Sequence, residues 1–293
     1  MTVEIRCVLE AEASLGEGPI WCPRKGLLYW VDILRGQIHW FDPESREDHF
    51  CELDETVGAV ALRQEGGLLV ALGSTLVFVD PEVGSIELIA APEPHLPRNR
   101  FNDGKCDRHG RFWIGSMDTD EVSPSGALYC LDTDRSLTRI FGEVTIGNGL
   151  GWSPSDDVIY FTDSPLRTIY AMDFDLASAR VGPRRVFTEV PADRGFPDGL
   201  TVDAEGCVWG AHWDGGCLTR YTPDGRIDRV LELPVPRPTS VAFGGADLDT
   251  LYVTSARVGL VPEALAAAPL SGGLFAISGT GCKGLPEPAY RTL

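Results

Sequence analysis

One strand pattern recurs six times along this chain, and the repeat restricts the possible fold more than any other feature. Each copy is a short aromatic or β-branched run between turn residues, which is typical of a strand. The copies are Leu28–Asp32, Leu68–Leu72, Phe112–Ser116, Ile159–Asp163, Val208–His212 and Leu251–Ser255. Their second residues are 40 to 49 positions apart. A period of this length indicates a repeat architecture rather than a chain of unrelated elements.

Further strands accompany each copy, so that every repeat contains three or four. A second strand follows at Ile38–Asp42, Leu76–Asp80, Leu128–Asp132, Ile169–Asp173, Leu218–Thr222 and Leu274–Ser278. A third precedes the marker strand, as at Gly58–Leu62. Six such repeats predict an all-β fold, a six-bladed β-propeller with a central channel, as a single domain over residues 1–293.

The ends of the chain must close the ring of blades. Val3–Leu9 is the predicted outer strand of the sixth blade, and the tail at Tyr290–Arg291 is the alternative. Helical periodicity is confined to Pro262–Ala268, which predicts one short helix inserted in the last blade.

Charge excludes some classes of partner. The formal net charge is −18, with 43 acidic and 25 basic residues. An acidic chain repels phosphates, so neither nucleic acid nor an anionic membrane is an expected partner. No apolar run approaches the roughly 20 residues that span a bilayer.

The eight cysteines form no C-x-x-C pair, and several fall inside predicted strands. Met1–Arg6 shows no basic region followed by an apolar run, so no signal peptide is visible. We therefore expect reduced thiols and a cytoplasmic protein. No pattern specifies an assembly, and a monomer or weak homo-oligomer is expected.

A column of polar residues stands at the start of the innermost strands. Aligning those strands puts six residues in one column, namely Glu17, Val57, Asp103, Asn148, Asp198 and Pro238. Innermost strands line the channel of a propeller, so these side chains should meet at its mouth. Asx-Gly pairs also occur in ordinary turns. Their register at the blade period favours a set of hard oxygen ligands for Ca²⁺, Mg²⁺ or Mn²⁺.

Four motifs in this order resemble the gluconolactonase/regucalcin (senescence marker protein) family. They are Ser14–Trp21, Asn99–Lys105, Gly147–Leu150 and Phe196–Leu200. The resemblance implies one divalent cation, Ca²⁺ first and Zn²⁺, Mn²⁺, Mg²⁺ or Fe²⁺ as alternatives, held by Glu17, Asn148 and Asp198. It also implies that Arg100 and Asn102 bind substrate, that Asp120 binds sugar hydroxyls, and that Asp103 supports the metal.

The resemblance further implies a hydrolase that opens a sugar aldonolactone, of the gluconolactone or pentonolactone type. The metal would polarise the lactone carbonyl and Asp198 would activate water. Two other functions stay open, a non-catalytic calcium-binding propeller and a lactonase or esterase for a non-sugar ester. The chain contains no G-x-S-x-G or H-E-x-x-H motif, which leaves serine-hydrolase and zincin chemistry without support.

Overall fold

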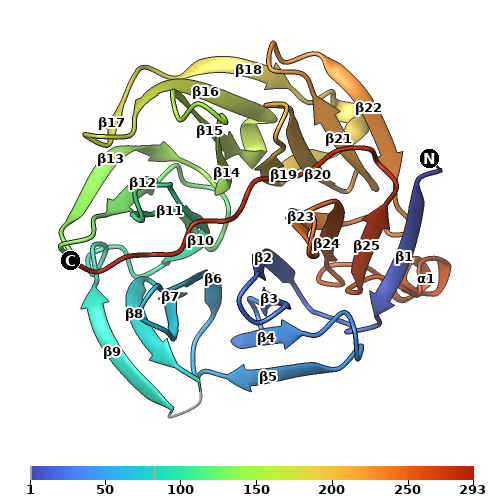
Figure 1. Cartoon of the computed structure of the whole chain (residues 1–293), viewed down its shortest axis with the longest axis horizontal. Coiled ribbons are helices and arrows are strands. Elements are labelled where there is room, and N and C mark those ends of the chain that lie inside the picture. Colours follow the sequence, from blue (N-terminus) through green and yellow to red (C-terminus); the bar gives the residue numbers. More distant parts are fainter. Residues whose placement is uncertain (1, 82–83) are drawn as a thin grey trace.

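Six antiparallel sheets surround a central axis in the computed structural model, which describes residues 2–81 and 84–293 (Figure 1). Five sheets have four strands and the fourth has five. The predicted six-bladed propeller is therefore confirmed.

The strands occupy equivalent positions in every blade. The innermost are β2 (Gly16–Cys22), β6 (Val57–Leu62), β10 (Asn99–Cys106), β14 (Gly147–Trp152), β19 (Phe196–Val202) and β23 (Pro238–Gly244). The second are β3 (Leu27–Asp32), β7 (Leu68–Leu72), β11 (Phe112–Asp118), β15 (Val158–Asp163), β20 (Val208–Trp213) and β24 (Thr250–Ser255). The third are β4 (Gln37–Phe41), β8 (Thr75–Asp80), β12 (Gly126–Leu131), β16 (Thr168–Asp175), β21 (Cys217–Tyr221) and β25 (Leu274–Ser278). The outer strands are β5 (Asp48–Glu52), β9 (Ser85–Ala90), β13 (Leu137–Val144), β17 (Arg180–Val181), β18 (Arg185–Glu189), β22 (Ile227–Glu232) and β1 (Glu4–Leu9).

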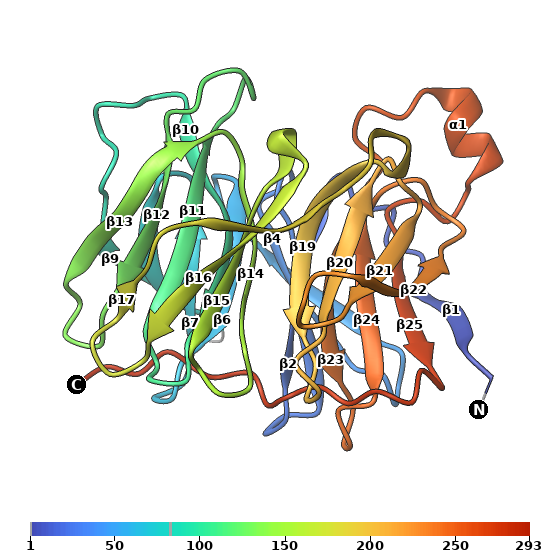
Figure 2. The ribbon, with the colours of Figure 1, turned by 90° about the horizontal axis from the view of Figure 1, so that it is seen from above.

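The N-terminal strand closes the ring. β1 pairs antiparallel with β25, so the last sheet is built from both ends of the chain and its order is β1-β25-β24-β23. The predicted role of Val3–Leu9 is confirmed. The C-terminal tail takes a different course across one end of the propeller, where Tyr290 bridges Arg63 (Figures 1 and 2).

The core lies between the blades, where the second and third strands present apolar side chains to their neighbours. Trp113 and Trp209 occupy equivalent positions in the third and fifth blades, Trp30 lies one residue further along the same strand of the first blade, and all three are almost fully buried. Each indole Nε1 donates to a carboxylate, that of Asp48, Asp107 or Asp203, at 2.9 to 3.3 Å. A buried indole therefore keeps its hydrogen bond, as the energetics of burial require.

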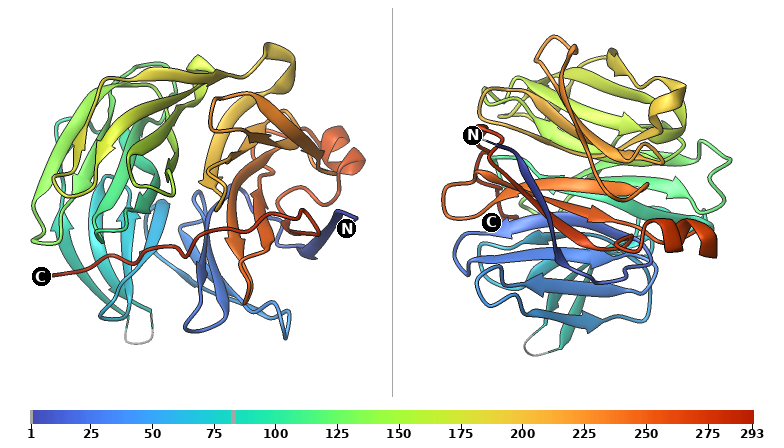
Figure 3. Two further views of the ribbon diagram at one scale, coloured as in Figure 1. Left: turned by 45° about the horizontal axis from the view of Figure 1, so that its top comes forward. Right: turned by 90° about the vertical axis from the view of Figure 1, so that its right-hand side faces the viewer.

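Helices are few. The predicted helix is present as α1 (Pro262–Ala267), which protrudes beside the last blade (Figure 3). Two short 3₁₀ helices, η1 (Ser164–Leu166) and η2 (Ala192–Arg194), lie near the start of β19. Among the described residues no helix is long and apolar enough to cross a membrane.

Candidate active site

In every blade, the pairing of the innermost strand with the second strand is interrupted near the start of the innermost strand. Register shifts fall at Glu17/Ile20, Val57/Ala59, Phe101/Gly104, Asn148/Leu150, Pro197/Leu200 and Pro238/Val241. A bulge leaves residues unpaired and redirects their side chains. These shifts coincide with the predicted polar column, so the polar side chains are freed from the sheets where the strands begin.

Close backbone packing accompanies the bulges. Gly149 has a φ of +30°, and a Cβ there would lie 2.6 Å from the carbonyl oxygen of Asp198. Only glycine fits such an approach. The neighbouring blades thereby bring Asn148 and Asp198 together.

The predicted metal ligands converge at this level. Asn148 Nδ2 donates to Asp198 Oδ1 and, at 3.1 Å, to Ser164 Oγ. Glu17 Oε2 accepts from the Gly18 amide at 3.0 Å. Only 6% of Glu17 and 6% of Asp198 is exposed. Residues from the first, fourth and fifth blades therefore share one buried polar centre.

Three acids lie in this centre, and nearby cations offset only part of their negative charge. Burial raises the pKa of Glu17 and of Asp198 well above the usual range, and repulsion among Glu17, Asp198 and Asp103 adds to the shift. Burial also raises the pKa of Asp103 to about 6, although the Lys105 ammonium opposes the rise. Within the described chain these three acids form no ion pair within 4.0 Å, although the Arg100 charge acts on Glu17 and the Lys105 charge acts on Asp103. Buried acids without a cation are costly, which favours a bound positive charge.

The donor set fits a divalent metal ion. Two carboxylates are hard oxygen ligands, and a 180° rotation of the Asn148 amide would turn its Oδ1 toward Asp198 in place of Nδ2. Ser164 Oγ can serve the rotated amide as a donor. Glu17, Asn148 and Asp198 are therefore the residues that would hold the ion.

Arg100 and Asn102 form a second polar group next to these ligands. Arg100 Nη1 donates to Asn102 Oδ1 at 2.8 Å and to the Phe101 carbonyl at 2.9 Å. Asn102 Nδ2 donates to the Gly147 carbonyl at 3.1 Å. Burial lowers the pKa of the Arg100 guanidinium to about 10, and the nearby Glu17 carboxylate opposes that change. A cationic donor and an amide thus flank the acidic centre.

Asp120 does not join this polar centre. Its side chain is 57% exposed and pairs with Arg98 at 2.9 Å. Its neighbour Glu121 is the acid whose charge acts on Arg100 and on Asp198. Glu121 has a φ of +58°. The spacing of acids along a loop does not reveal such a change in backbone direction, so the sequence could not tell which of the two acids acts on Arg100.

The structure adds residues that the sequence analysis did not single out. Lys105 Nζ lies 3.3 Å from Glu287 Oε1 and 3.2 Å from the Leu200 carbonyl, beneath Asp103. Lys105, Thr201 and Glu287 are among the residues that line a cavity between the innermost strands and the tail. Lys105 was detectable as a cation two residues from Asp103. Glu287 was not, because it reaches the channel from the distant tail.

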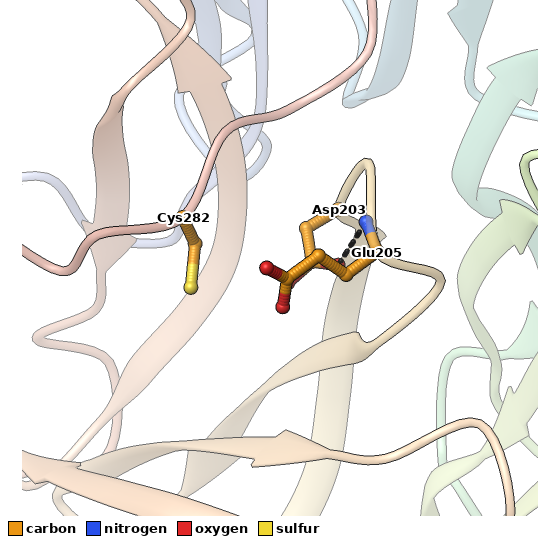
Figure 4. A group of neighbouring side chains, drawn as sticks. All are labelled: Asp203, Glu205 and Cys282. Atoms are coloured by element: carbon orange, nitrogen blue, oxygen red, sulfur yellow. Dashed lines mark hydrogen bonds between the residues drawn. The ribbon is translucent and has the colours of Figure 1, made fainter.

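A second acidic group lies in the fifth blade. Asp203, Glu205 and Cys282 place three potential ligand atoms within 4.8 Å of one another (Figure 4). Arg220 already provides this group with a cation, because its guanidinium pairs with Asp203, Glu205 and Asp228. Asp203 also accepts from the Trp209 indole and from two backbone amides. Its oxygens are therefore satisfied without a metal.

Comparison with known proteins gives one consistent result. The family model described as "SMP-30/Gluconolactonase/LRE-like region" matches residues 15–257. Regucalcin of Xenopus laevis is 35% identical over 296 residues, and 6-deoxy-6-sulfogluconolactonase of Pseudomonas putida is 37% identical over 291, each match covering 99% of both chains. A crystal structure of regucalcin from Agrobacterium tumefaciens, described as a calcium-binding protein, is 32% identical with a TM-score of 0.94, covering 98% of this chain and 97% of that one.

Proposed function

The chain belongs to the SMP-30/gluconolactonase family, and from this premise we propose that it is a divalent-metal-dependent hydrolase that opens a sugar lactone to its aldonic acid. The relative from Pseudomonas putida carries the name of a sugar lactonase, which supports this substrate class. The observation that carries the proposal is the convergence of Glu17, Asn148 and Asp198 on a buried centre whose negative charge is only partly compensated.

The proposed cofactor is Ca²⁺, because two carboxylates and an amide carbonyl are the oxygen ligands that this ion prefers. Mg²⁺, Mn²⁺, Zn²⁺ and Fe²⁺ are the alternatives. When bound, the ion supplies a Lewis acid for the lactone carbonyl. Three protein ligands leave coordination positions for substrate and water.

Within this site Asp198 is the proposed general base. Its carboxylate takes a proton from water as the water oxygen forms a bond to the carbonyl carbon. The bond between that carbon and the ring oxygen then breaks, and the ring oxygen leaves as a hydroxyl by taking back the proton that Asp198 accepted from water.

Arg100 and Asn102 are the proposed orienting residues. They bond to each other at 2.8 Å beside Glu17, so both present fixed polar atoms to a bound sugar. Holding the ring in one orientation lowers the entropic part of the barrier. Asp120 keeps a proposed role in binding hydroxyls only where substrate draws it away from Arg98, and Glu121 is the acid better placed to do so.

A panel of pentono- and hexonolactones, assayed by acid release with and without chelator, tests the proposal. We expect turnover of at least one lactone, its loss with chelator, and its recovery on adding a divalent metal. Calcium binding without hydrolysis of any lactone would instead indicate a non-catalytic calcium-binding propeller.

A further inference from the structure

Arg167 differs from most arginines at the end of the propeller that carries the site. Five others there pair with a carboxylate within 4.0 Å, namely Arg35, Arg98, Arg194, Arg237 and Arg257. Among the described residues Arg167 forms no such ion pair. Its Nη1 donates to the Gly195 carbonyl, and its Cζ lies 3.8 Å from the centroid of the Phe196 ring.

The segments that hold Arg167 are those that position the candidate ligands. Arg167 directly follows η1, and Ser164 in η1 accepts from the Asn148 amide. Phe196 stands two residues before Asp198 in β19, a separation of roughly 7 Å along an extended strand. In Figure 2, η1 is the yellow-green turn near the centre of the upper end. The guanidinium is therefore held beside the mouth of the channel.

Stacking leaves the bonding edge of the guanidinium available. The ring of Phe196 covers a face of the group, whereas its N–H donors lie in its plane. One nitrogen is engaged by the Gly195 carbonyl. A planar fork of this kind binds carboxylate, phosphate or sulfonate oxygens with two parallel hydrogen bonds.

The net negative charge of the chain makes an unpaired cation such as Arg167 important for any anionic ligand. A protein of net charge −18 repels anionic ligands unless a local cation offsets the field. An arginine kept unpaired and half-buried at the mouth is such a cation.

We propose that Arg167 binds an anionic substituent at the end of the lactone remote from the carbonyl, so that the enzyme prefers acidic sugar lactones. This inference rests on the proposed lactonase function. Arg98 and Arg194 do not compete for the substituent, because their guanidiniums are engaged by acids.

Two lactones that differ only in the terminal group provide the test. The γ-lactone of D-glucaric acid carries a terminal carboxylate, and the γ-lactone of D-gluconic acid carries a hydroxymethyl group. The Arg167→Gln variant should lose about 10- to 100-fold in kcat/KM for the first, as expected for a charge-assisted hydrogen bond. Its loss for the second should stay below about threefold. Arg167→Lys should recover part of the difference, because it keeps the charge without the fork.

Arg194→Gln is the matched control, since it removes the same charge from the next segment of the chain without removing the proposed contact. It should leave the ratio of the two kcat/KM values unchanged. An equal loss for both lactones in Arg167→Gln would show that Arg167 has a structural role through its bond to Gly195. That result would overturn the inference and leave the lactonase proposal standing. A wild-type protein that hydrolyses only the gluconic lactone would also overturn the inference. Failure to hydrolyse either, with turnover of another lactone of the panel, would overturn the inference alone, whereas failure with the whole panel would overturn the lactonase proposal as well.

Discussion

Two buried acidic groups, one at each end of β19, differ in their electrostatic surroundings. In the fifth blade Asp203 is fully buried and lies 2.8 Å from the Arg220 guanidinium. The third blade repeats the arrangement, with Asp107 bound to Arg111 at 2.7 Å. The channel acids Glu17, Asp103 and Asp198 are equally buried but have no such partner. Burial alone therefore does not distinguish a structural carboxylate from a functional one, whereas the source of the compensating charge does.

The largest expected effect is on activity, at the channel group. Asp198→Asn should keep the fold and lower lactone turnover by about 10² to 10⁴, the usual contribution of a general base. Steady-state kinetics on the best lactone of the panel measures the loss, and circular dichroism checks the fold. Turnover near the wild-type rate would remove Asp198 from the mechanism.

The next largest effect is on stability, at the paired group. Arg220→Met should lower the free energy of unfolding by about 3–5 kcal/mol, because it leaves Asp203 buried without its cation. Urea denaturation measures the change. Turnover per folded molecule should be unaltered. A loss below about 1 kcal/mol would show that Asp203 does not depend on Arg220.

The pH dependence of the metal-free protein should reveal the uncompensated charge. The folded-state pKa of Asp103 is raised from 3.8 to about 6, so the folded state binds more protons than the unfolded state between these values. The free energy of unfolding should consequently fall by up to about 3 kcal/mol as the pH rises from about 4 to about 6. Asp103→Asn should remove this contribution. Chemical denaturation of chelator-treated protein across this range measures it, and a stability that rises with pH in both proteins would contradict the assignment.

The smallest effect concerns the rim of the paired group. Glu205 binds Arg220, but its side chain is 67% exposed. Exposed ion pairs contribute about 0–1 kcal/mol, so Glu205→Gln should be nearly neutral in the same urea experiment. A loss comparable to that of Arg220→Met would mean that Glu205 is essential to the group.

The repeat pattern predicted the fold because strand alternation and turn residues are local properties of the chain. It predicted the six blades, and it aligned Glu17, Asn148 and Asp198 in one column at the strand starts, where the structure has its register shifts. The period of the blades was sufficient for that alignment, since a ring converts equal spacing along the chain into proximity at the axis.

The repeat pattern could not predict contacts that depend on the direction in which a side chain points. Asp120 and Glu121 are adjacent in sequence, yet a positive φ separates the acid that pairs with Arg98 from the acid that acts on Arg100. The Lys105–Glu287 pair joins residues 182 positions apart through the path of the tail. The three acids around Arg220 likewise come together only in the folded blade.

Calorimetric titration of chelator-treated protein with Ca²⁺ tests most directly whether the channel acids, rather than the acids around Arg220, hold the metal. One acid of each group is substituted in turn. The wild-type protein should bind one ion per chain, Glu17→Gln should weaken that binding at least about tenfold, and Glu205→Gln should leave it unchanged. Loss of binding in Glu205→Gln, with binding retained in Glu17→Gln, would place the metal at Asp203, Glu205 and Cys282 and contradict the account.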